Sequence, residues 1–180
     1  MKRRLSISLA LVLVLICMFS LTSCFATDGP GINEGYKSFN NGAISFDYPE
    51  TWLNIPFVKE FAGMNMIMDL EGSGNNINVN SIPKTDEFEK IEDADAFLEQ
   101  IAPEIESSGM TVKDGKLEKG TTNGLDYVMV SFSSTLSNLP MYQSIILTTV
   151  GEHTYLITVT EVQPDSVYVE TIISTLSAVE

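Results

Sequence analysis

Apolar and polar residues alternate along much of the second half of the chain, and this alternation constrains the fold more than any other feature of the sequence. The alternating segments are Thr111 to Lys119, Leu125 to Ser133, Met141 to Val150 and Thr154 to Val162. Asn123-Gly124 and Gly151-Glu152-His153 are turn signals between neighbouring segments. Period-two alternation places successive side chains on opposite faces of a strand, and short turns join antiparallel strands. The sequence therefore predicts a run of antiparallel strands.

A strand rich in aromatic residues is predicted near the start of the globular part. Ile44, Phe46 and Tyr48 face the same way, and Pro49 ends the run because proline cannot donate to a central ladder. Trp52 is expected to pack just beyond this end.

A glycine-bearing turn indicates a hairpin further along the chain. Met64 to Leu70 and Asn75 to Ile82 flank Glu71-Gly72-Ser73-Gly74. Ile77 and Val79 alternate with asparagines on the second arm, which predicts one buried and one solvated face.

Two segments have helical spacing instead. The first spans residues 93–107, and its apolar residues recur every three or four positions at Phe97, Leu98, Ile101 and Ile105. Gly109 is a plausible end, and Pro103 is expected to kink or split this helix because it lacks a backbone donor. The second begins with Pro164 at the first helical position and Asp165 in the first turn. Its apolar stripe is Val169, Ile172, Ile173, Leu176 and Val179.

This order of elements predicts an α+β sandwich, an antiparallel sheet covered by two helices. The segment from Ile44 to Trp52, ISFDYPETW, resembles the opening F-x-Y-P-x-x-W strand of PsbP-like domains, and Val169 to Leu176 resembles their closing helix. The resemblance covers nearly all of residues 42–180. It implies association with partners more than catalysis, and its motifs are structural, so no binding residue is transferred.

The N-terminus has the pattern of a secretory signal. Lys2, Arg3 and Arg4 precede an apolar stretch from Leu5 to Leu21. A transmembrane helix needs about 20 apolar residues, so length alone does not separate a signal peptide from an uncleaved signal anchor.

The cleavage region favours the signal peptide. Leu21, Thr22, Ser23 and Cys24 resemble the bacterial lipobox, which implies that Cys24 receives diacylglycerol and becomes the new N-terminus outside the cytoplasm. Two or more acyl chains attach a protein stably to a membrane. We therefore predict an extracytoplasmic bacterial lipoprotein, anchored to the cell membrane through Cys24.

The chain then divides into three parts. Residues 1–23 are the predicted signal peptide, residues 24–41 the lipidated cysteine with a flexible tether, and residues 42–180 one α+β domain. Cys17 lies in the removed segment and Cys24 carries the lipid, so the mature chain is expected to hold no free thiol.

The mature chain is strongly acidic. Removing Lys2, Arg3 and Arg4 leaves seven basic residues against 24 acidic ones, a net charge of −17. Such a surface repels phosphate backbones, which excludes nucleic acid as a partner. It favours cationic partners or cations if it binds any, and its simpler interpretation is a solvated surface that resists aggregation.

No catalytic residue, cofactor or metal site is predicted. His153, the only histidine, falls at a predicted turn without a cysteine partner, and no serine lies in a G-x-S-x-G motif. Carboxylate pairs stay possible among so many acids. The densest acid cluster is Asp86, Glu87, Glu89, Glu92, Asp93 and Asp95. It lacks the spacing of a calcium loop, and acids at a helix start are expected from the helix dipole.

These observations favour a non-catalytic binding or accessory module of the cell envelope. Its expected partners are the membrane, through the lipid on Cys24, and an unknown envelope protein or small ligand. One alternative is a carboxylate-dependent envelope hydrolase such as a glycosidase. Another is a purely structural component of the envelope.

Overall fold

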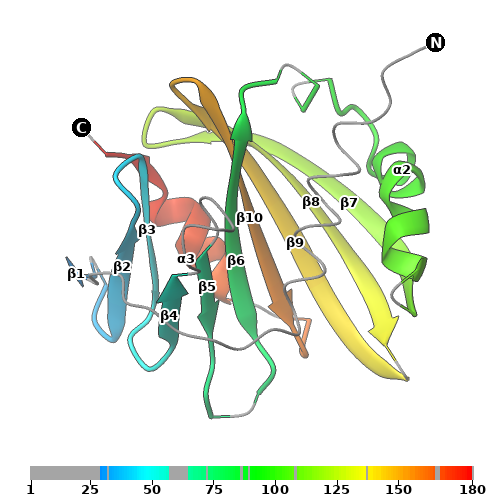
Figure 1. Cartoon of the computed structure of the whole chain (residues 1–180), viewed down its shortest axis with the longest axis horizontal. Helices are drawn as coiled ribbons and strands as arrows, with labels where there is room; N and C mark the ends of the chain where they lie inside the picture. Colours follow the sequence, from blue (N-terminus) through cyan, green and yellow to red (C-terminus); the bar gives the residue numbers. More distant parts are fainter. Residues whose placement is uncertain are drawn as a thin grey trace.

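The larger of two antiparallel sheets has seven strands in the order β4-β5-β6-β10-β9-β8-β7 (Figure 1). They are β4 (Leu53–Pro56), β5 (Asn65–Met68), β6 (Asn76–Pro83), β7 (Met110–Thr122), β8 (Leu125–Leu136), β9 (Leu139–Val150) and β10 (His153–Glu161). The computed structural model describes residues 29–31, 33–56, 65–71, 73–85, 87–88, 90–107, 109–136, 138–164 and 167–179. The predicted signal peptide, the lipobox and Cys24 lie outside these residues.

The four consecutive strands predicted from the alternation are confirmed as β7, β8, β9 and β10. Each pairs antiparallel with the next along the chain. Asn123 and Gly124 join β7 to β8 with φ angles of 46° and 79°, and two successive positive φ angles suit a type I′ turn. Strands β7, β8 and β9 are longer than predicted because their pairing continues where the alternation stops, as at Leu136 opposite Leu139.

The predicted hairpin that precedes the first helix is also confirmed. Strands β5 and β6 pair with Ile67 opposite Ile77, and Gly74 in the turn has a φ of 84°. Strand β4 was not predicted; it adds to the edge of this hairpin with Leu53 opposite Met68.

A second sheet has four strands in the order β1-β2-β3-β11. They are β1 (Gly29–Pro30), β2 (Tyr36–Asn40), β3 (Ile44–Pro49) and β11 (Ser177–Ala178). The α+β class is therefore confirmed, but the expected single sheet is divided into two. The apolar face predicted for β3 is confirmed, because Ile44, Phe46 and Tyr48 are fully buried.

The prediction that residues 24–41 form a flexible tether is wrong for their second half. Strand β2 pairs with β3 along its whole length, and Phe39 stands opposite Phe46 with ring centroids 4.9 Å apart. Both rings are buried. Burial of a large aromatic side chain offsets the entropy lost when the segment is ordered. The described fold thus includes Gly29–Pro30, which pairs with β2.

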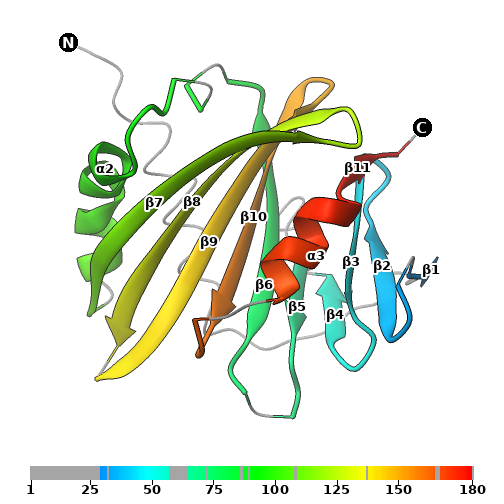
Figure 2. The same cartoon turned by 180° about the vertical axis from the view of Figure 1, so that it is seen from behind.

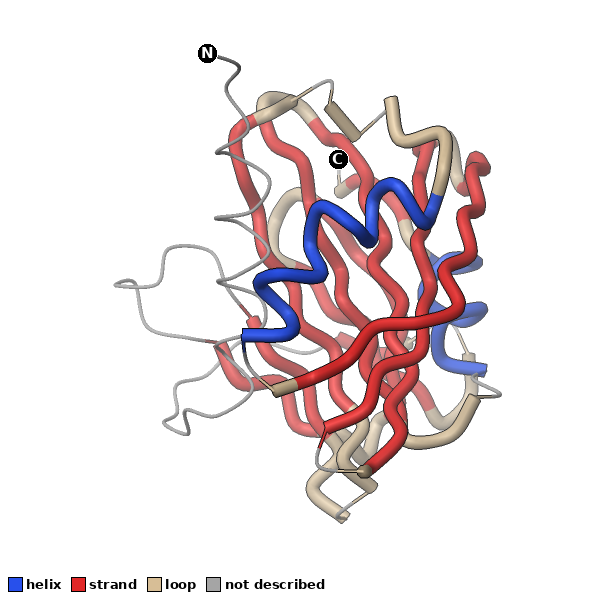
Figure 3. The backbone as a smooth tube through the Cα atoms, turned by 90° about the vertical axis from the view of Figure 1, so that its right-hand side faces the viewer, coloured by secondary structure: helices blue, strands red, loops and turns tan. Residues whose placement is uncertain are grey.

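The two helices cover opposite faces of the larger sheet (Figures 2 and 3). They are α2 (Ala94–Ser107) and α3 (Val167–Thr175). Neighbouring residues of the central strand β10 show the division: Ile157 belongs to the same buried cluster as Ile172 of α3, whereas Leu156 belongs to the cluster of Ile101 in α2. The smaller sheet lies on the α3 side, because its aromatic residues join the cluster of Ile172.

The prediction that Pro103 could split the first helix is wrong. Helix α2 runs without a break through Pro103. Ile101 and Ile105 of this helix are fully buried. A proline inside a helix costs about 3 kcal/mol, and burial of each isoleucine contributes about 1.5–3 kcal/mol, so packing offsets the lost hydrogen bond. Gly109 follows the helix with a φ of 84°, as expected for its end.

The second predicted helix is confirmed as α3, but the predicted stripe is one turn too long. Helix α3 ends at Thr175, and the chain enters β11, just after which the Val179 N–H donates to the Ala43 carbonyl. Pairing of β11 with β3 satisfies backbone groups of this segment by hydrogen bonds to a neighbouring strand. Pro164 precedes the helix, and Asp165 lies outside the described residues.

Trp52 is buried, as predicted, with 3% of its surface exposed. Its ring centroid lies 4.9 Å from that of Tyr168 in α3, at an interplanar angle of 56°. The tryptophan therefore connects the link between β3 and β4 to the helix that covers the larger sheet.

Candidate functional site

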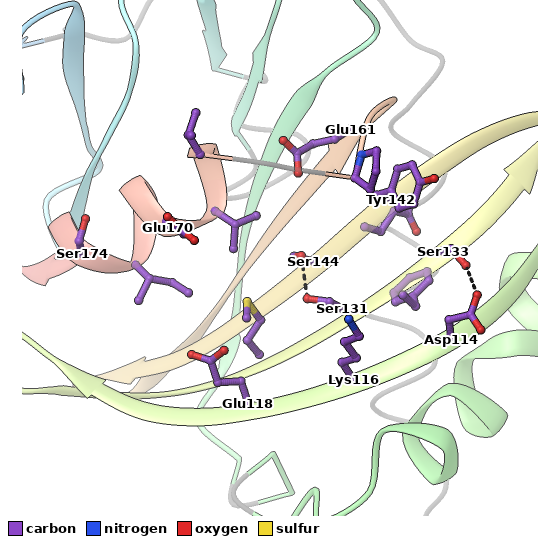
Figure 4. A pocket seen from close by; sticks show the side chains of 17 residues that line it. Asp114, Lys116, Glu118, Ser131, Ser133, Tyr142, Ser144, Glu161, Glu170 and Ser174 are labelled. Atoms are coloured by element: carbon purple, nitrogen blue, oxygen red, sulfur yellow. Dashed lines mark hydrogen bonds between the residues drawn. The ribbon is translucent and has the colours of Figure 1, made fainter.

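A groove lies between α3 and the face of the larger sheet that this helix covers (Figure 4). Its volume is about 940 Å³, within the range of cavities that hold small ligands. The lining comes from β7, β8, β9, the end of β10 and α3. Val167, Val169 and Ile173 of α3 make one wall apolar, whereas the side chains from the sheet are mostly polar.

Strand β7 supplies three charged side chains to the groove. Asp114, Lys116 and Glu118 occupy every second position and line the cavity. The register between β7 and β8 shifts between Lys113 and Lys116, and Asp114 has a φ of 58°. The Ser133 hydroxyl donates to Asp114 Oδ2 over 2.9 Å. This irregularity with its hydrogen bond therefore orients Asp114 along the groove.

The floor of the groove carries neutral hydroxyl groups. Ser131 on β8 and Ser144 on β9 are hydrogen-bonded to each other over 2.8 Å. They lie opposite each other in the strand register, so both point to the same face of the sheet. Hydroxyl groups can donate and accept, which lets this floor bind polar groups of either kind.

Two further carboxylates come from the other side. Glu161 ends β10 and is buried, and Glu170 lies on α3. With Asp114 and Glu118 they make four carboxylates against the single ammonium group of Lys116 among the lining residues. A cleft lined mainly by one sign of charge concentrates ions of the opposite sign, so the groove attracts cationic groups.

Glu118 is positioned by a tyrosine. The Tyr127 hydroxyl donates to Glu118 Oε1 over 2.7 Å, and this hydrogen bond, together with burial, raises the pKa of Tyr127 above its usual value. The ring covers Gly120, where a Cβ atom would come within 2.7 Å of the Tyr127 hydroxyl oxygen. Only glycine at position 120 leaves room for this contact. Tyr127 and Gly120, which do not line the groove, therefore fix the orientation of Glu118.

Changing Glu118 to glutamine is expected to lower the pKa of Tyr127 toward its usual value, because the largest cause of the raised pKa is the hydrogen bond to this carboxylate. Since the folded-state pKa of Tyr127 is raised, the corresponding stability is present below the unfolded pKa of about 10 and is lost as the pH rises further. Alkaline ultraviolet titration measures the midpoint, and Tyr127→Phe identifies the signal. An unchanged midpoint in Glu118→Gln would contradict this coupling.

His153 lies away from the groove. It is exposed at the first residue of β10, whereas Glu161 of the groove is the last residue of that strand. Its ring centroid is 6.5 Å from that of Tyr155.

The predicted acid cluster marks the start of α2. Asp93 Oδ1 accepts the backbone N–H groups of Asp95 and Ala96 over 2.7 and 3.1 Å, which is how an N-cap residue satisfies free donors. Asp86 and Glu89 lie outside the described residues. In the part of the chain that the structure describes, no group of three or more His, Cys, Asp or Glu residues could hold a metal ion.

The groove residues were not singled out by sequence reasoning. The alternation of Asp114, Lys116 and Glu118 was visible, but it indicates only the solvated face of a strand. Their proximity to Glu170 depends on how α3 packs back across the sheet.

Across the described ranges, no helix has the length and apolar character needed to cross a membrane.

The architecture is similar to that of cyanobacterial PsbP from Synechocystis sp. PCC 6803. The TM-score is 0.60, and the match covers 88% of this chain and 99% of that chain. The domain has the PsbP-like fold. This finding confirms the expectation drawn from the segment ISFDYPETW. Sequence identity with that protein is 15%, so the similarity establishes the PsbP-like fold alone.

Two other solved structures have lower TM-scores. A protein from Bacteroides thetaiotaomicron has a TM-score of 0.49 and 13% identity, with 76% of this chain and 45% of that chain covered. LpqN, involved in cell envelope biogenesis of Mycobacterium tuberculosis, has a TM-score of 0.42 and 11% identity, with 84% of this chain and 100% of that chain covered. No protein-family model and no curated protein matches the sequence.

Proposed function

We propose that this protein is an extracytoplasmic lipoprotein whose PsbP-like domain binds a cationic partner without catalysing a reaction. The lipid on Cys24 anchors the chain, and the groove between α3 and the larger sheet binds the partner. The observation that carries the proposal is the groove itself, in which four carboxylates and one lysine line a cavity of about 940 Å³. Lysine or arginine side chains of an envelope protein fit this charge.

The shape of the groove supports a partner with both charged and apolar groups. The sheet supplies carboxylates and serine hydroxyls, and α3 supplies Val167, Val169 and Ile173. An amphipathic basic segment could place its ammonium groups over the sheet and its apolar side chains against the helix. Such a segment has complementary charge, which accelerates association and orients the partner.

Hydrogen bonding in the groove favours binding over hydrolysis. A glycosidase needs one carboxyl group that gives a proton to the leaving group. Asp114 and Glu118 each accept a hydrogen bond from a hydroxyl, Ser133 and Tyr127 respectively. These hydrogen bonds hold the two carboxyl groups in fixed positions on the sheet, which suits recognition of a partner.

Crosslinking in cells tests the proposal directly. A photoreactive residue at Ser174, an exposed position on the wall of the groove, is expected to capture a defined envelope protein. The same residue at Glu152, an exposed turn position outside the groove, is the matched control. Identical products from both positions would contradict the groove as the binding site.

Charge variants test the chemistry of the groove. Glu170→Gln is expected to weaken binding of the captured partner about two- to five-fold, the range for a partly exposed charge pair, and added salt should weaken it further. Lys116→Gln is the opposite control and should strengthen binding. If the protein turned over a glycan, and Glu170→Gln abolished this turnover with the fold intact, the protein would instead be a hydrolase.

A further inference from the structure

Among the residues that the structure describes, the large exposed apolar side chains lie in connections between elements or at the first residue after a connection. They are Leu53, Leu70, Leu139, Val162 and Val167, with 44%, 60%, 67%, 39% and 59% of their surface exposed. We call these five residues the apolar end. The connections that contain or precede them, from β3 to β4, β5 to β6, β8 to β9 and β10 to α3, lie toward the same end of the larger sheet, the lower end in Figures 1 and 2.

Contacts join the parts of the apolar end around Leu53, Leu70 and Val162. Leu53 begins β4 opposite Met68, two residues before Leu70. In the same turn, a Cβ atom on Gly74 would lie 3.4 Å from Val162 Cγ1. The Val162 N–H donates to Asn75 Oδ1 over 3.1 Å. The turn after β5 and the segment after β10 are therefore in direct contact.

The predicted anchor lies within reach of this end. Gly29 is in register with Ser38, which is in register with Asp47, two residues before the end of β3 at Pro49. At a rise of about 3.4 Å per residue, Gly29 is about 7 Å from that end of the strand. The five residues from Cys24 to Gly29 span at most about 18 Å. A lipid on Cys24 therefore keeps the adjacent end of the domain close to the bilayer.

We propose that the apolar end rests on the lipid surface, with its leucine and valine side chains between the headgroups, when the chain is anchored at Cys24. This inference rests on the lipid attachment proposed above. Exposed leucines on separate loops gain hydrophobic stabilisation from such contact because each leaves water when it enters the interface.

Acidic side chains near the apolar end determine which lipid headgroup charge is compatible with membrane contact. Glu50, Asp69 and Glu71 lie in the links that carry Leu53 and Leu70. Asp69 accepts the Glu71 backbone N–H over 2.8 Å, a bond that suits a charged carboxylate. Zwitterionic phosphatidylcholine is therefore the appropriate bilayer, since anionic headgroups would repel these carboxylates.

Quenching of fluorescence by spin-labelled acyl chains tests the orientation, because it requires the fluorophore to enter the bilayer. The sample is the full chain, lipid-modified in cells and reconstituted into phosphatidylcholine vesicles that contain the spin labels. Environment-sensitive fluorophores are attached to Leu70→Cys, Leu139→Cys and Glu152→Cys. Leu139 and Glu152 lie at opposite ends of the 12-residue strand β9, about 40 Å apart at the usual rise. We expect quenching at positions 70 and 139 to be at least three times that at position 152.

The possible outcomes separate the orientation from the anchor. Chains that stay on vesicles but show equal quenching at the three positions overturn the membrane contact and leave the anchor intact. Chains that do not stay on vesicles overturn both. Disulfide crosslinks between two anchored Leu70→Cys chains, without quenching, would show that a second copy covers the apolar end instead. A further comparison uses a fluorophore at Val167→Cys in two chains, one otherwise unchanged and one that also carries Leu70→Asp and Leu139→Asp. The fluorophore should be quenched in the first chain and not in the second.

Discussion

Replacing Cys24 with alanine is expected to abolish lipid attachment completely. The proposed lipobox at Leu21 to Cys24 has one acceptor thiol, and a side chain without sulfur cannot form the thioether to diacylglycerol. The precursor should then keep residues 1–23, because lipid transfer comes before cleavage in this class of signal. Metabolic labelling with a fatty acid analogue, followed by gel electrophoresis, measures both the lipid and the size of the chain.

Cys17 provides the control for this experiment. It lies in the apolar stretch of the predicted signal, seven residues before Cys24. Cys17→Ala removes a thiol of the same chain and is expected to leave labelling and processing unchanged. A Cys24→Ala chain that is still labelled and shortened would show that the lipoprotein interpretation is wrong.

Replacing Trp52 with alanine is expected to lower the free energy of unfolding by about 3–5 kcal/mol, the usual range for the loss of a large buried aromatic side chain. Trp52 is 3% exposed and packs 4.9 Å from Tyr168, ring to ring. Its loss would leave a cavity where the smaller sheet, α3 and the larger sheet meet. Urea denaturation of the purified chain, followed by far-ultraviolet circular dichroism, measures the change.

The next residue in the chain is the matched control. Leu53 is 44% exposed, so Leu53→Ala is expected to cost less than about 1 kcal/mol. Equal denaturation midpoints for Trp52→Ala and Leu53→Ala would contradict the view that burial at Trp52 joins the three layers.

Local pattern was sufficient to predict most of the secondary structure. Alternation located β7 to β10, since side chains at period two separate a buried from a solvated face regardless of what covers them. Asn123-Gly124 identified the turn between β7 and β8 because few residue pairs tolerate two positive φ angles. Trp52 could be placed in the core because one large aromatic residue follows a strand that ends at Pro49.

Other features depended on partners far along the chain. Residues 36–40 have little periodicity, and their strand is recognised only because β3 lies beside them and Phe39 meets Phe46. The Asn123 side chain also donates to the carbonyls of Ser174 and Leu176 over 3.1 and 3.0 Å. These contacts satisfy one carbonyl in the last turn of α3 and one just after the helix, and the sequence near Asn123 contains no sign of them.

The candidate site shows the same division. The sequence alone determined the acidic character of the chain, which is a matter of composition. It also determined the alternation of charges on β7 and the apolar stripe of α3, because each is a property of neighbouring residues. Only the tertiary structure placed Glu161 and Glu170 across from Asp114 and Glu118. That arrangement requires α3 to pack back over the sheet, and the direction of this packing is decided by burial of Val169 and Ile172 against strands that are distant in sequence.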